Sequence, residues 1–96
     1  MQNYHEPPSE LSMQTRDFTR ALNILKEETE AIDWYEQRIN VTEDKHLKKI
    51  LKHNQFEEME HACMTHEWLR RNMKGWDKQM KQYLFTNKEI VKPEDE

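Results

Sequence analysis

Residues 47–68 read LKKILKHNQFEEMEHACMTHEW, and one helical face of this stretch carries polar residues that folding alone would not select. Steps of three or four residues define that face, which is formed by Leu47, Leu51, Asn54, Glu58, His61, Thr65 and Trp68. An apolar stripe with this period normally faces a protein core. Glu58 and His61 therefore stand at positions where Leu or Ile would be expected.

Glu58 and His61 are also neighbours on that face, because residues three apart in a helix lie side by side. A carboxylate and an imidazole turned together toward a low-dielectric interior are costly unless something neutralises them. A divalent metal ion would both neutralise the charge and coordinate the two side chains. The pair therefore indicates a metal site.

The composition predicts an all-α protein. The chain has 96 residues, of which 34% are hydrophobic and 35% charged, so it forms a single domain with little material for a core of its own. It contains one Gly and three Pro, and good helix formers occur throughout. We therefore expect part of the burial to come from a partner, namely another copy of the chain.

Several classes of function are disfavoured. The net charge is −4 and the charges are interspersed, whereas nucleic-acid binding requires a clustered basic face. The lysines at positions 45, 48, 49 and 52 are expected on a solvated face. No apolar run approaches the roughly 20 residues of a membrane span. The single cysteine, Cys63, excludes an intramolecular disulfide, fits a cytoplasmic location, and is expected to be a small buried residue.

The chain divides into a flexible N-terminal segment (1–8), one helical domain (9–85) and a flexible acidic tail (86–96). Within the domain, Ser9 or Ser12 is expected to cap a first helix that ends near Ile39.

A second long helix should follow a short connection, which makes the two helices an antiparallel hairpin. Thr42 is the expected N-cap of this helix, and Asn72 is expected to end it in a left-handed conformation. Gly75 marks a bend, after which Trp76 begins a shorter third helix.

The first helix carries a second misplaced carboxylate. Its stripe consists of Leu11, Phe18, Leu22, Leu25, Glu28, Ile32, Tyr35 and Ile39. Glu28 interrupts this seam, whereas Glu27 and Glu30 point to other faces and are expected to be more exposed.

Glu28 and the Glu58/His61 pair make up half of a known type of site. The di-iron sites of ferritin-like bundles use one Glu from each of two helices and a Glu-x-x-His from each of two more. Two copies of the hairpin, related by a two-fold axis, would form a four-helix ferritin-like bundle with four Glu and two His around two metal ions.

These ligand types suit Fe(II), Mn(II) or Zn(II), and a carboxylate-rich set stabilises Fe(III). The expected reaction is therefore the oxidation of Fe(II) by O2. Glu58 would bridge the two ions, with Glu28 and His61 as terminal ligands. Tyr35, on the same stripe as Glu28, would hydrogen-bond a ligand or bind metal directly.

Two other interpretations remain open. The chain could be a metal-stabilised helical assembly module in which Zn(II) or Ca(II) is structural, with secondary acidic positions as further sites for these ions. Alternatively, it could be a helical adaptor without metal, in which Glu and His pair with Arg or Lys across an interface.

The sequence also resembles the encapsulated ferritins. The matching runs are 28–38 (ETEAIDWYEQR), 53–62 (HNQFEEMEHA), 67–72 (EWLRRN) and 83–86 (YLFT), which occur in order at the family's spacing. The likeness begins at His5 and covers nearly the whole chain.

The resemblance implies a ferroxidase with its centre at a dimer interface. Glu28, Glu58 and His61 correspond to the family's ferroxidase ligands, and Tyr35 corresponds to a tyrosine of that centre.

The resemblance further implies a ring-like decamer of five dimers that passes oxidised iron to an encapsulin shell, so the protein would lie inside an encapsulin nanocompartment. Glu27 and Glu30, next to Trp34, correspond to acidic residues where metal ions enter from the inner side of the ring. The family's shell-docking peptide normally lies at the C-terminus, and the residues after Thr86 do not resemble it.

Overall fold

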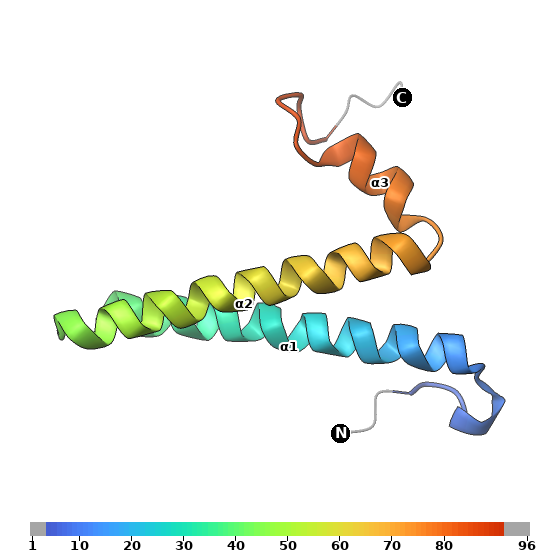
Figure 1. The fold of residues 1–96 in the computed structure, drawn as a ribbon, viewed down its shortest axis with the longest axis horizontal. Coiled ribbons are helices and arrows are strands. Elements are labelled where there is room, and N and C mark those ends of the chain that lie inside the picture. Colours follow the sequence, from blue (N-terminus) through green and yellow to red (C-terminus); the bar gives the residue numbers. More distant parts are fainter. Residues whose placement is uncertain (1–3, 92–96) are drawn as a thin grey trace.

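The computed structural model describes residues 4–91, which form an open arrangement of three α-helices. A 3-10 turn, η1 (Pro8–Glu10), precedes α1 (Met13–Val41), α2 (Lys45–Asn72) and α3 (Trp76–Tyr83). The long helices α1 and α2 lie side by side and antiparallel, and α3 turns away from them (Figure 1). No strand occurs in these residues, so the predicted all-α hairpin with a short third helix is confirmed.

The first helix begins where one of the two expected caps stands. The hydroxyl of Ser12 accepts a hydrogen bond from the backbone N–H of Thr15 at 3.1 Å, which satisfies an otherwise unpaired donor of the first turn. At its other end the helix runs two residues beyond Ile39, to Val41.

The prediction that Thr42 caps the second helix was wrong. Thr42 ends α1, and its N–H donates to the carbonyl of Arg38 at 3.0 Å. The N-cap of α2 is Asp44, whose carboxylate accepts from the N–H of Leu47 at 2.8 Å. A carboxylate also suits the positive end of the helix better than a hydroxyl does.

The predicted left-handed cap at Asn72 was also wrong. Asn72 is the last residue of α2, its side-chain amide donates to the carbonyl of Trp68 at 2.8 Å, and the capping residue Met73 is extended. The change of direction falls at Gly75, as expected, where φ is +107°. A side chain would be strained there, which explains why glycine stands at the corner before α3.

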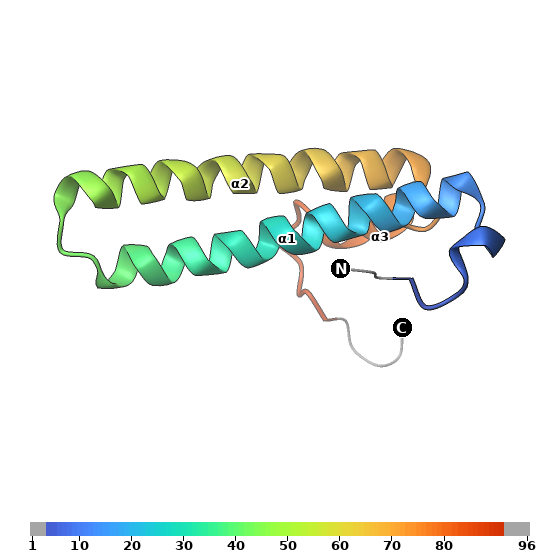
Figure 2. The same ribbon diagram turned by 90° about the horizontal axis from the view of Figure 1, so that it is seen from below.

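Little of the chain is buried. In the described residues the apolar core consists of Ala21, Leu51 and Leu69. The radius of gyration is 17.5 Å, whereas a compact domain of this length would have about 12 Å. Figure 2 shows the hairpin side-on, with its connection at one end and α3 near the other. An open hairpin of this kind lacks the second layer that a bundle core requires.

Large apolar side chains accordingly remain exposed on both long helices, including Ile24 on α1 and Phe56 and Trp68 on α2. Cys63, expected to be buried, is exposed in this single chain, so that prediction was wrong. It lies on a helix face that neither α1 nor α3 covers.

No described helix is long and apolar enough to cross a membrane. At the N-terminal end, the guanidinium of Arg16 donates to the carbonyl of Pro8 at 3.1 Å and holds η1 against α1. The outer parts of the two segments predicted to be flexible, residues 1–3 and 92–96, lie outside the described residues.

Candidate metal centre

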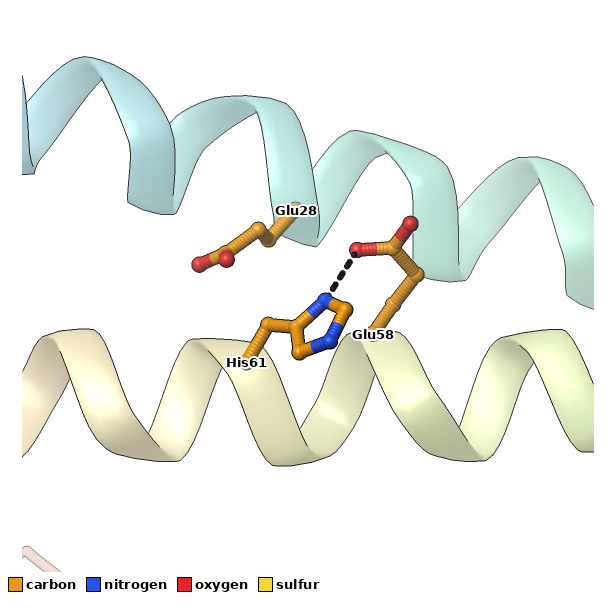
Figure 3. A group of neighbouring side chains, drawn as sticks. All are labelled: Glu28, Glu58 and His61. Carbon is orange, nitrogen blue, oxygen red and sulfur yellow. Dashed lines mark ion pairs between the residues drawn. The ribbon is translucent and has the colours of Figure 1, made fainter.

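Three side chains that sequence analysis singled out come together near the middle of the hairpin. Glu28 projects from α1, and Glu58 and His61 project from α2 toward it (Figure 3). One ligand atom from each of the three lies within 4.8 Å of the others. A metal ion about 2 Å from each donor could bridge such a spacing with small changes of side-chain rotamer.

Within this cluster, Glu58 and His61 contact each other directly. Nδ1 of His61 lies 3.5 Å from Oε1 of Glu58, an ion-pair distance that is longer than a normal hydrogen bond. The Glu58 side chain is 28% exposed and that of His61 is 47% exposed. The contact is therefore weak and partly solvated, so an arriving cation can replace it at small cost.

Glu28 has a different partner. The hydroxyl of Thr65 on α2 donates to Oε1 of Glu28 at 3.2 Å, and this contact is partly buried. Sequence analysis placed Thr65 on the same stripe as His61 but assigned it no role. Its position one turn beyond His61 was the available signal, although the register between the two helices was needed to connect it to Glu28.

A single chain does not complete the coordination of a metal ion. Each chain provides three donors, two carboxylates and one imidazole, whereas transition metals in proteins take four to six. The remaining positions must come from water or from a second chain. Because His61 is exposed, the open side of the cluster faces away from the hairpin core.

Tyr35 lies outside this cluster. It is half-buried on α1, and the guanidinium of Arg38 lies 5.5 Å from its ring centroid. Its role at the centre stays a prediction.

Glu27, Glu30 and Trp34 are exposed on α1, whereas Glu28 is half-buried. The prediction that Glu27 and Glu30 are more exposed than Glu28 is therefore confirmed. Within the described part of the chain, neither Glu27 nor Glu30 belongs to a group of three metal-ligating side chains.

His66, on another face of α2, is half-buried, because its ring lies 5.9 Å from that of Trp76 at the start of α3.

The strongest charge interactions lie away from the candidate centre, at the corner between α2 and α3. The Arg70 guanidinium donates two hydrogen bonds to Glu67, at 2.8 and 2.7 Å, and one to Asp77 at 2.6 Å. The bonds that Arg70 and Arg71 donate to Glu67 lower the pKa of Glu67 to about 2. Arg70 also lowers the pKa of Asp77, and Lys81 contributes. This ion-pair cluster links α3 to α2.

Comparison with known proteins places the chain in a family. Residues 3–87 match the model described as EncFtn-like. A "Ferritin-like protein" of Thermotoga maritima is 60% identical over 93 residues, covering 97% of this chain and 82% of the relative. An "Encapsulated ferritin-like protein" of Rhodospirillum rubrum is 47% identical over 87 residues, covering 91% of this chain.

This chain spans 62% of the length of the Rhodospirillum relative. Among solved structures, a crystal structure of a protein from Nitrosomonas europaea matches with a TM-score of 0.90 and 54% identity, covering 95% of this chain and all of that one. The predicted resemblance to the encapsulated ferritins and the ferritin-like helical fold are thereby confirmed.

Proposed function

The chain belongs to the EncFtn-like family, whose members include encapsulated ferritin-like proteins, and from this premise we propose that it is a ferroxidase. Its substrates would be Fe(II) and O2, and its centre would be a di-iron carboxylate site shared by two copies of the chain. Family membership by itself indicates a role in handling iron.

One observation carries this proposal most directly. Two carboxylates and one imidazole from different helices present ligand atoms within 4.8 Å of one another. Oxygen and nitrogen donors without a thiolate suit iron, and the excess of carboxylates favours the ferric state. The set would therefore make oxidation of the bound ion more favourable.

The number of donors argues for two chains. Three donors per chain leave an ion incompletely coordinated, while two chains contribute four carboxylates and two imidazoles to a pair of ions. In this arrangement Glu58 of each chain would bridge the ions, and Glu28 and His61 would be terminal ligands. The open shape of the single chain and its exposed apolar side chains support such a pairing.

Two adjacent ions also match the electron demand of the reaction. Each Fe(II) gives up one electron when it becomes Fe(III), so the pair supplies the two electrons that reduce O2 to the peroxide level. The carboxylates compensate the added positive charge. Tyr35, two turns beyond Glu28 on α1, would hydrogen-bond a ligand or bind metal.

We extend the proposal to the assembly. Glu27, Glu30 and Trp34 are exposed on α1 and would form the place where iron enters the ring. Two copies would form the dimer, and five dimers the decamer. The Rhodospirillum relative is named as encapsulated, and we propose that an encapsulin shell likewise receives the iron oxidised by this chain.

The deciding experiment loads the metal-free protein with Fe(II) under anaerobic conditions and then admits O2. A ferric absorbance that rises faster than in a protein-free solution supports the ferroxidase. If the protein binds the metal but oxidation is no faster than in buffer, the site is structural, as for Zn(II) or Ca(II). If elemental analysis of protein purified without a chelator finds no metal, only the adaptor role remains.

A further inference from the structure

We propose that Thr65 is a positioning residue of the candidate centre, whose hydroxyl holds the Glu28 carboxylate in place for metal binding. This inference rests on the proposed metal centre, and it adds a residue that ligates no metal itself. Its basis is the contact that Thr65 of α2 makes with Glu28 of α1, the ligand that comes from the opposite helix.

Glu28 needs such a partner more than the other two ligands do. Glu58 and His61 are one turn apart on α2, so their relative position is set by that helix alone. Glu28 reaches the cluster from across the hairpin on a flexible side chain. In the described part of the chain, the one side-chain hydrogen bond to its carboxylate comes from Thr65, at 3.2 Å.

The Thr65 hydroxyl has one proton and two acceptors within reach. Besides Oε1 of Glu28, the carbonyl of His61 lies 3.1 Å from Oγ1, in the back-bonding position common for threonine in helices. A bond to a carboxylate is stronger than one to a neutral carbonyl. The proton should therefore favour Glu28 in the metal-free chain.

The second acceptor lets Glu28 move without leaving the hydroxyl unpaired. If both oxygens of Glu28 turn to a metal, the hydroxyl can donate to His61 instead, so no buried donor is left unsatisfied. Thr65 would then orient Glu28 before binding without opposing the shift that binding requires.

The surroundings strengthen this contact. Thr65 is half-buried and lines an open groove between α1 and α2, whose other lining residues are Asp17, Arg20, Ala21, Ile24, Met64 and Trp68. The contact between Thr65 and Glu28 is partly buried, so water has less access to it than to a fully exposed hydrogen bond. A hydrogen bond in such a setting is stronger than one in open solvent.

The test replaces the hydroxyl without changing the shape of the side chain. In Thr65→Val, the affinity of the metal-stripped full chain for Co(II), followed by its visible absorption, should fall about tenfold, the lower end of the range for loss of a partner of a metal ligand. Thr65→Ser restores a hydroxyl and should bind within about threefold of the parent, since the donor to the carboxylate is kept.

Thr29→Val is the matched control. The Thr29 hydroxyl also donates to the carbonyl four residues back, that of Leu25 at 2.8 Å, but it is exposed and bonds no proposed ligand. Its Co(II) affinity should equal that of the parent. If Thr65→Val does not fold, Thr65→Ala takes its place with the same expected loss.

The possible outcomes separate this inference from the proposed centre. Unchanged Co(II) binding in Thr65→Val, or an equal loss in Thr65→Ser, overturns the role of the hydroxyl and leaves the centre standing. A parent chain that binds no Co(II) overturns both. Loss in Thr65→Val with recovery in Thr65→Ser supports the inference.

Discussion

Glu28 on α1 and His61 on α2 place ligand atoms within 4.8 Å of each other, although they belong to different helices. The hairpin connection sets this proximity, because it fixes which turn of α1 lies opposite which turn of α2. Glu58 lies one turn from His61 and completes the group.

Removal of any one proposed ligand should abolish rapid iron oxidation. We expect Glu28→Ala, Glu58→Ala and His61→Ala to reduce the initial rate after Fe(II) addition to that of a protein-free solution, because each ion would lose a donor. Absorbance of the ferric product measures the rate, and circular dichroism should show unchanged helix content.

Glu57→Ala is the matched control for Glu58→Ala. Glu57 directly precedes Glu58 on α2, is exposed, and pairs with His53 at 3.3 Å, outside the cluster. The Glu57→Ala variant should oxidise Fe(II) at the parent rate. Parent rates in all three ligand variants would exclude the site.

Metal should stabilise the association of two chains. Because a shared centre binds metal only in the dimer, metal at 100 times the dissociation constant should add about 2.7 kcal/mol to the stability of the dimer for each ion bound. Analytical ultracentrifugation with and without a chelator measures the shift. Association that is equally strong with and without the chelator would contradict a shared centre. Elemental analysis should find about one metal ion per chain.

The exposed acidic residues of α1 should affect delivery of iron and not the centre itself. We expect Glu30→Ala to slow the uptake phase severalfold while anaerobic binding at the centre stays intact. Stopped-flow absorbance separates the two, because uptake precedes oxidation. Loss of the metals of the centre in this variant would show that Glu30 is itself a ligand or supports one.

The ion-pair cluster at Arg70 should protect the corner between α2 and α3 against acid. The pKa of Glu67 is lowered from 4.5 to about 2, so its contribution to stability is fully present above pH 4.5 and is lost as the pH falls toward 2. Arg70→Gln should therefore reduce the acid-dependent part of the stability in this range. Tryptophan fluorescence, to which Trp76 at the start of α3 contributes together with Trp34 and Trp68, measures the change.

Arg20→Gln provides the control for this experiment. Arg20 pairs with Asp17 within α1 at 2.6 Å, and both side chains are exposed. Exposed ion pairs of this kind contribute little to stability. Its acid profile should match that of the parent. An acid profile for Arg70→Gln identical to the parent would mean that apolar contacts alone hold α3.

Much of the fold followed from periodicity. The stripes on both long helices, the short connection between them and the glycine at the corner predicted the hairpin and the third helix, because each signal is local. The capping residues were less predictable. Asp44 caps the second helix in place of the expected Thr42, since neighbouring polar residues compete for the same unpaired backbone groups. Asn72 stays helical and Met73 ends the helix, a shift of one residue that is common at helix ends.

Burial was the weaker part of the prediction. Cys63, which was expected to be buried, is exposed because the described chain has no layer on that face. His66 is half-buried because the ring of Trp76, at the start of α3, lies beside it. Burial depends on what packs against a side chain, which the period of one helix does not specify.

The sequence by itself determined that Glu58 and His61 share a face and that Glu28 breaks an apolar seam, because helical period converts spacing into direction. Only the tertiary structure decided that these side chains meet and that Thr65 bonds Glu28. The physical reason is the register between α1 and α2. It depends on how the connection and the side chains of both helices pack, and a single stripe does not contain it.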